Sequence, residues 1–198
     1  MSPSQPTQHG SPPTFDFEID DSLTPWNLPA KAWLTKHGKH WDGLATGSIV
    51  FNAQGQILII QRASHDSMPN KWEIPGGAAD EEDPTLFHSA ARELWEEAGL
   101  IAKRFTHIVT EGPDREPGQV FTNRTGTRTF CRFSFQVEVE GCEHVRLDPM
   151  EHQDYLWATE DEIREQKTGD RELPITNSGV TSLILEAFRL RGQMAKAA

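Results

Sequence analysis

Apolar and polar residues alternate along several segments of the chain, and the period of the alternation separates predicted strands from predicted helices. Residues 45–52 and 56–62 are apolar and β-branched and flank the turn sequence NAQG, which predicts a hairpin. The alternation is most regular from Phe133 to Val139. Further strands are expected in residues 71–77, 104–111, 119–122, 127–141 and 154–159.

A helical spacing of apolar residues predicts a helix over residues 84–98. Asp83 is expected to cap the N-terminus of this helix, with Pro84 at the first helical position. Gly99 is expected to end it, because glycine adopts the left-handed conformation that follows many helices. The buried stripe of the helix would consist of Phe87, Ala91, Leu94 and Ala98.

Three other helices are expected. One lies near residues 29–37, and a second begins where Thr159 and Glu162 have the spacing of a capping box. The last spans about 178–195, with an apolar face of Val180, Leu183, Ile184, Ala187 and Phe188. Strands interleaved with a few helices indicate a mixed α/β or α+β domain.

The length of 198 residues suits one domain with a sizeable core. Residues 1–14 are rich in Pro, Ser and Gln, which predicts a disordered tail. Residues 15–44 hold three tryptophans and are expected to pack on the domain, since so much apolar surface is unusual in a free linker. The domain itself is expected to span residues 45–198.

The charge of the chain excludes some function classes. The formal net charge is −11 and the pI is about 5.1, which argues against a nucleic acid polymer as partner. No apolar run approaches the roughly 20 residues of a membrane span, and residues 1–15 lack a charged region followed by an apolar one, so they are not expected to act as a secretory signal. A cytoplasmic protein without a membrane partner is therefore expected. Cys131 and Cys142 do not form a disulfide framework.

The helix predicted over residues 84–98 carries an unusual set of carboxylates. Glu93, Glu96 and Glu97 fall within a wedge of about 100°, because residues three and four apart are neighbours on a helix. Like charges at this spacing weaken a helix, and the helix dipole disfavours anions near the C-terminal end. Clustered carboxylate oxygens suit a hard divalent cation such as Mg²⁺. The pattern lowers the stability of the helix but suits cation binding, a combination that is common at functional sites.

Residues 76–100 resemble the Nudix box, G-x5-E-x7-R-E-U-x-E-E-x-G-U, in which U is a bulky apolar residue. Every fixed position of the C-terminal half is matched. The predicted hairpin, the WEIPGG segment and EHQDYLWATEDEI also look like Nudix framework, so the resemblance covers about residues 44–190. The sequence of the box resembles that of Nudix domain proteins common in filamentous fungi. The resemblance implies an α/β/α sandwich, with a mixed β-sheet between helices, that hydrolyses a diphosphate linkage with Mg²⁺ or Mn²⁺.

The box departs from the family pattern in one respect. The first glycine and the arginine are 14 positions apart in the family, whereas Gly77 and Arg92 are 15 apart. Counting back from Arg92 puts Pro84 where the family has a glutamate. That glutamate supports the arginine in the family, and Glu82 or Asp83 could replace it here.

The resemblance also implies roles for individual residues. Glu93 and Glu97 would be the principal metal ligands, and Glu96 a ligand or the general base. Arg92 would hold the loop against the helix. Gly76 and Gly77 would let the backbone turn tightly where substrate phosphate and metal approach.

Two residues outside the helix complete the expected site. Glu151 is a candidate general base, because the base of this family can come from a loop outside the box. Arg62 is a candidate for binding substrate phosphate, and an exposed solubilising charge is an equally good interpretation of it. His88 and His152 have no partner pattern and are expected to be structural or exposed.

The substrate stays open. The partner would be a small diphosphate: ADP-ribose, a nucleotide sugar, a nucleoside triphosphate, a dinucleotide or a prenyl diphosphate. A homodimer is compatible with this interpretation. Two other functions remain: a non-catalytic Nudix-type ligand sensor, and an isopentenyl diphosphate isomerase-like enzyme, which would need a catalytic cysteine.

Overall fold

The structure is a computed structural model, and it describes residues 12–197. Most of the predicted 1–14 tail lies outside these residues. The helices are η1 (Asp21–Trp26), α1 (Ala30–Lys36), α2 (Leu86–Ala98), α3 (Glu160–Glu165) and α4 (Ser178–Ala197). Among the described residues, no helix combines the length and apolar content that crossing a bilayer requires.

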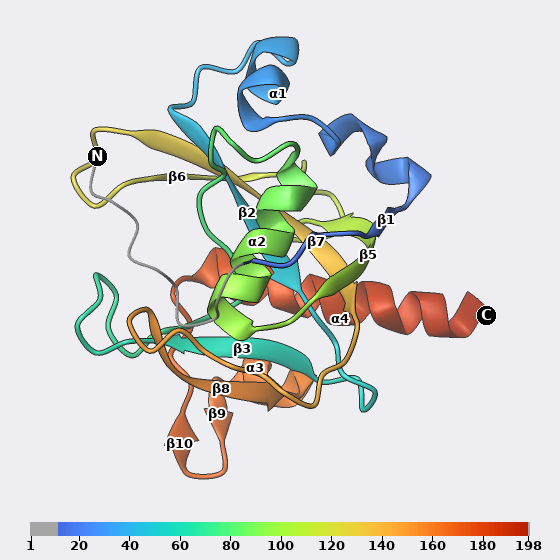
Figure 1. The fold of residues 1–198 in the computed structure, drawn as a ribbon. Coiled ribbons are helices and arrows are strands. Elements are labelled where there is room, and N and C mark those ends of the chain that lie inside the picture. Colours follow the sequence, from blue (N-terminus) through green and yellow to red (C-terminus); the bar gives the residue numbers. More distant parts are fainter. Residues whose placement is uncertain (1–11, 198) are drawn as a thin grey trace.

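The strands form three sheets (Figure 1). The largest has the order β1 (Glu18–Ile19), β5 (Ala102–Val109), β7 (Thr129–Val139), β2 (Gly43–Ile49), and β6 (Gln119–Thr122) also pairs with β7. The second has the order β4 (Trp72–Glu73), β3 (Ile57–Arg62), β8 (His152–Ala158). The third joins β9 (Lys167–Thr168) to β10 (Arg171–Glu172). The largest sheet is mixed, because β2 runs parallel to β7 whereas β5 and β6 run antiparallel to it.

Helices cover the strands from opposite sides, with α2 in front and α4 behind in Figure 1. The apolar stripe of α2 is buried in one cluster with Phe133 and Phe135 of β7. A second cluster joins the inner face of α4 to Ile57 and Ile59 of β3. The layered arrangement expected from the sequence is therefore present, and the predicted buried faces of both helices are in the core.

The predicted hairpin of residues 45–52 and 56–62 pairs only next to its turn, where Phe51 is bridged antiparallel to Ile57 and Leu58 donates its backbone N–H to the carbonyl of Val50. Its turn forms, since Asn52 donates its backbone N–H to the carbonyl of Gln56, but β2 and β3 then enter different sheets. The segment that leads to α2 pairs with the free edge of β2. The backbone N–H of Thr46 donates to the carbonyl of Gly77, and the backbone N–H of Ser48 donates to the carbonyl of Pro75. This substitution places the Gly76–Gly77 turn directly beside β2.

The start of α2 also differs from the prediction. Thr85, not Asp83, is the N-cap, because its side chain accepts a hydrogen bond from the backbone N–H of His88. Pro84 therefore precedes the helix. The end of the helix agrees with the prediction, since Gly99 has φ +68°. The side chain of Asp83 is engaged elsewhere, with Arg92.

Residues 15–44 contact the rest of the domain through apolar side chains and one strand. β1 pairs in parallel with β5, and Trp33 of α1 is buried with its ring 4.7 Å from that of Phe133. Trp26 also packs against Phe133, at 6.2 Å between ring centroids. These contacts cover the core without reaching the carboxylates of α2.

Candidate active site

The Gly76–Gly77 turn brings backbone against the acidic face of α2. Gly76 has φ +154°, and a Cβ there would lie 2.2 Å from the carbonyl oxygen of Thr46. A Cβ on Gly77 would lie 2.5 Å from a carboxylate oxygen of Glu93. The backbone N–H of Gly76 donates to Oε2 of Glu97 at 2.6 Å. A side chain at Gly76 would collide with the backbone of β2, so this position requires glycine, whereas a side chain at Gly77 would displace the carboxylate of Glu93.

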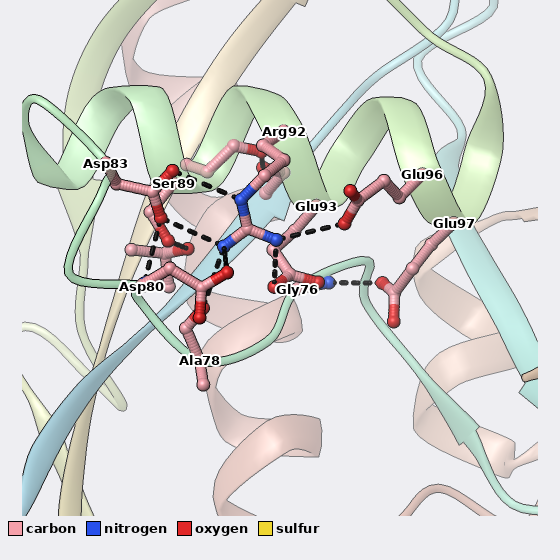
Figure 2. A network of polar contacts seen from close by, with 12 residues as sticks. Gly76, Ala78, Asp80, Asp83, Ser89, Arg92, Glu93, Glu96 and Glu97 are labelled. Carbon is pink, nitrogen blue, oxygen red and sulfur yellow. Dashed lines mark hydrogen bonds and ion pairs between the residues drawn. The ribbon is translucent and has the colours of Figure 1, made fainter. Parts of the chain in front are cut away.

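Arg92 lies at the centre of a polar network (Figure 2). Its Nε and Nη2 donate to the two carboxylate oxygens of Asp83, at 3.1 and 2.9 Å. Its Nη1 donates to Oε1 of Glu93 at 2.8 Å and to Oε2 of Glu96 at 2.9 Å. Asp83 is therefore the acid that supports Arg92 in the lengthened loop, and Glu82, the other candidate, is exposed.

The inner end of the site is shielded from solvent. Glu97 is 5% exposed, and His152 of β8 is 2% exposed with its Nε2 3.9 Å from Oε1 of Glu97. The same Nε2 lies 3.4 Å from Oε1 of Glu73, a buried carboxylate of β4. Glu73 also accepts a hydrogen bond from Nη1 of Arg62 at 2.5 Å. Arg62 forms a second ion pair with Asp66, so its charge is already shared by two carboxylates.

Burial makes the ionised form of the central carboxylates unfavourable. Burial raises the pKa of Glu93 to about 7, against the lowering effect of Arg92. Burial, with the charges of Glu93 and Glu73, raises the pKa of Glu97 well above its usual range. The pKa of Glu73 is lowered: burial opposes this, but the hydrogen bond with His152 and the charge of Arg62 outweigh it. A divalent cation would relieve the repulsion at Glu93 and Glu97, so the donor set fits one.

A second grouping of possible ligands includes residues from β8 and the loop before it. Glu97, Glu151 and His152 each offer one ligand atom, and these atoms lie within 4.8 Å of one another. Glu151 thus lies beside Glu97, as its assignment to the site required. His152, which was expected to be structural or exposed, is buried against the carboxylates of Glu73 and Glu97.

These groups face a cavity of about 710 Å³. Gly76 and Gly77 line it, and of the predicted acids Glu93, Glu97 and Glu151 do so as well, whereas Glu96 does not. Arg62 is a further predicted residue in the wall. The lining residues that sequence reasoning missed include His152, Arg132 and Phe121.

The missed residues gave weak signals in the sequence. A buried glutamate inside a strand, Glu73 in WEIPGG, is unusual and could have drawn attention. Arg132 occupies a polar position in an alternating strand, which a solvent-facing residue would also do. Their proximity depends on pairing between distant strands.

Comparison with known proteins gives a consistent assignment. A family model described as NUDIX domain matches residues 41–176. The RNA pyrophosphohydrolase of Psychrobacter sp. (strain PRwf-1) is 46% identical over 111 residues, covering 52% of this chain and 60% of that protein. Phosphatase NudJ of Escherichia coli (strain K12) is 33% identical over 98 residues, covering 48% and 54%. The chain thus spans little more than half the length of these curated relatives.

Solved structures share the fold at low identity. The MutT protein from Methanosarcina mazei Go1 superposes with a TM-score of 0.56 at 22% identity, over 76% of this chain and 95% of that one. The mixed α+β sandwich expected from the sequence is therefore confirmed.

Proposed function

Because the chain belongs to the NUDIX domain family, we propose that it is a divalent-cation-dependent hydrolase that cleaves a diphosphate linkage in a small organic diphosphate. One observation carries the proposal. Two carboxylates, the half-buried Glu93 and the buried Glu97, lie against the Gly76–Gly77 turn and line a cavity of about 710 Å³. Clustered carboxylates repel one another and lower stability, but they can bind a cation that in turn binds a phosphate group in the same cavity.

Glu93 and Glu97 would hold the cation, with Glu151 and His152 near enough to contribute. A bound Mg²⁺ or Mn²⁺ would stabilise negative charge at phosphorus and make water more acidic. The relatives named RNA pyrophosphohydrolase and phosphatase support hydrolysis at phosphorus as the reaction class.

The chain's own residues would orient the reacting groups. Arg92 fixes the carboxylates of Glu93 and Glu96, and the N–H of Gly76 fixes one oxygen of Glu97. Glu151, exposed at the cavity wall, would accept the proton of the attacking water at a carboxylate oxygen. Fixed donors of this kind lower the reorganisation that the reaction requires.

The isomerase alternative finds no support in the cavity. Neither Cys131 nor Cys142 is among the described residues that line it. Burial raises the pKa of Cys131 to about 12, which leaves its thiol protonated and unreactive near neutral pH.

A product-release screen tests the proposal. The full chain would be incubated with Mg²⁺ and ADP-ribose, nucleotide sugars, dinucleotides, nucleoside triphosphates and prenyl diphosphates, with EDTA as a blank. Glu97→Gln is the inactive variant, and Glu82→Gln is its control because Glu82 is an exposed acid of the same box.

We expect hydrolysis of at least one compound, at least about 100-fold slower in Glu97→Gln and unchanged in Glu82→Gln, since even partners of metal ligands contribute 10- to 100-fold. Turnover that persists in EDTA or in Glu97→Gln would overturn the proposal.

A further inference from the structure

The pairing of β3 with β8 is irregular beside the acidic cavity, the cavity of about 710 Å³ in which the candidate site lies. Gln61 is opposite Asp154, whereas Arg62, the next residue of β3, is opposite His152. Gln153 is therefore an extra residue on β8, which is the arrangement of a β-bulge. A bulge bends its strand and changes the direction of neighbouring side chains, so this one affects how His152 enters the site.

The side chain of Gln153 bonds only to β3 and to the loop that follows it, residues 63–71. Its Oε1 accepts a hydrogen bond from the backbone N–H of Ser64 at 3.1 Å. Its Nε2 donates to Oε1 of Gln61 at 3.1 Å and to Oδ1 of Asn70 at 2.8 Å. Ser64 and Asn70 lie near opposite ends of the loop, so one side chain of β8 joins both ends.

The loop of residues 63–71 is also connected to the segment that carries Glu151. Three of its residues line the acidic cavity: His65, Asp66 and Ser67. Nε2 of His65 lies 2.9 Å from the carbonyl oxygen of Met150. The backbone N–H of Ala63 donates to the carbonyl oxygen of Glu151 at 2.8 Å. A shift of the loop would therefore be transmitted to Glu151.

The partners of Gln153 are themselves fixed. Gln61 is 9% exposed, and its Nε2 donates to the carbonyl oxygen of Asn70 at 3.0 Å. Its Oε1 accepts a further hydrogen bond, at 3.1 Å, from Nη2 of Arg171 on β10. Gln61 belongs to β3, the central strand of its sheet. The hydrogen bonds of Gln153 therefore anchor the bulge to a rigid part of the domain.

The position of the Glu151 carboxylate depends on the backbone that carries it. Within the described part of the chain, no hydrogen bond to another side chain fixes this carboxylate. A general base must lie within hydrogen-bond reach of the proton that it accepts, and small displacements lower the rate. The contacts that fix the backbone next to Glu151 should therefore affect the chemical step.

We propose that Gln153 is a positioning residue, whose hydrogen bonds hold the bulge of β8 against the loop of residues 63–71 and so place Glu151 where it can accept the proton of the attacking water. This inference rests on the proposed function, in which Glu151 is the general base. Gln153 itself does not line the acidic cavity, so its replacement should change the rate of the reaction rather than the binding of substrate.

The test compares two replacements of similar length in the full chain. Gln153→Met removes every hydrogen bond of the side chain, whereas Gln153→Glu keeps an oxygen that can accept from Ser64. Gln54→Met is the matched control, because Gln54 is an exposed glutamine of the turn before β3 and its side chain has no hydrogen bond among the described residues. Thermal unfolding confirms that each variant folds.

The first readout is the pair kcat and KM, measured with Mg²⁺ and ADP-ribose, or with the first compound of the screen above that the wild type hydrolyses. Gln153→Met should lower kcat roughly 10-fold or more and leave KM almost unchanged. Gln153→Glu should retain more activity, because the exposed amide of Asn70 can turn and donate to the new carboxylate. Gln54→Met should match the wild type. A purely structural role would lower the Tm without this split between kcat and KM.

The second readout needs no turnover. Hydrogen exchange at the backbone amide of Ala63 reports the bond from this amide to the carbonyl of Glu151. Exchange at Ala63 should be roughly five-fold faster in Gln153→Met, the factor that one hydrogen bond of average strength contributes. It should be unchanged in Gln54→Met. A wild-type kcat in Gln153→Met, or unchanged exchange at Ala63, would overturn the proposal.

The two readouts also separate this inference from the proposed function. A wild type that hydrolyses none of the compounds would contradict the proposed function, and faster exchange at Ala63 in Gln153→Met would still show that Gln153 holds Glu151. Hydrolysis that requires Glu97 but proceeds at the wild-type kcat in Gln153→Met would contradict this inference alone.

Discussion

Arg92 and Arg132 both lie beside the acidic cavity, and their surroundings are opposite. Arg92 uses its donors on Asp83, Glu93, Glu96 and the carbonyl of Ala78. Within the described residues Nε of Arg132 is buried without a hydrogen-bond partner, and the charge of this arginine helps to lower the pKa of the buried Glu73. A saturated guanidinium is part of the framework, because nothing is left for a ligand to bind. An unsaturated one at a cavity wall is available for substrate.

Replacing each arginine in turn tests the difference between them most strongly. Arg92→Met should destabilise the protein by about 3 kcal/mol or more, because it leaves several partly buried carboxylates without their cation. Arg132→Met should cost about 1 kcal/mol or less, since no ion pair is broken and only its attraction to Glu73 is lost. Urea unfolding at pH 7 measures both. Similar losses in the two variants would show that Arg132 is also framework.

The carboxylates around Arg92 should make stability depend on pH when no metal is present. The folded pKa values of Glu93 and Glu97 lie above the usual 4.5, so at these two groups the folded chain holds more protons than the unfolded chain from about pH 4.5 to 7. Stability contributed by these groups is therefore complete below pH 4.5 and is lost as pH rises. For Glu93 the loss reaches at most about 3 kcal/mol.

Glu97→Gln isolates this effect. Burial lowers the pKa values of His88 and His107, which acts in the opposite direction over the same range, so the difference between wild type and variant carries the test. In EDTA, the variant should gain stability relative to the wild type as pH rises from 5 to 8. A difference that stays constant with pH would contradict the pKa shifts of this cluster.

The smallest expected effect concerns the loop before α2. Asp83→Asn should cost about 1 kcal/mol, because the two hydrogen bonds to Arg92 lose their charged acceptor. Glu82→Gln, its neighbour, should be neutral, since Glu82 is exposed. Chemical denaturation measures the free energy of unfolding of both variants. A larger loss for Glu82→Gln would mean that the loop pairs Arg92 differently.

The sequence predicted what depends on local spacing. The buried stripe of α2, the Gly99 terminus and the capping box of Thr159 and Glu162 all follow from residues within a few positions of one another. The cap of α2 was mispredicted because Asp83 followed by Pro84 has the local pattern of a helix start. Its carboxylate is instead bound by Arg92, nine residues away.

Features that depend on distant pairing could not be predicted. β2 does not pair with β3 along its length, because the segment around Gly77 forms hydrogen bonds with the edge of β2. β1, β9 and β10 have two residues each, too few for any periodicity. His152 joined the site through the pairing of β8 with β3, and Arg132 through the pairing of β7 with β2 and β6.

The central claim is that Glu93 and Glu97 form a divalent cation site, and Mn²⁺ binding followed by electron paramagnetic resonance tests it most directly. The full chain, Glu97→Gln and Glu82→Gln would each be titrated at pH 7.5, where loss of the free Mn²⁺ signal reports binding. The account predicts that the wild type and Glu82→Gln bind Mn²⁺ alike and that Glu97→Gln binds at least about 10-fold more weakly. Equal binding by all three proteins would contradict it.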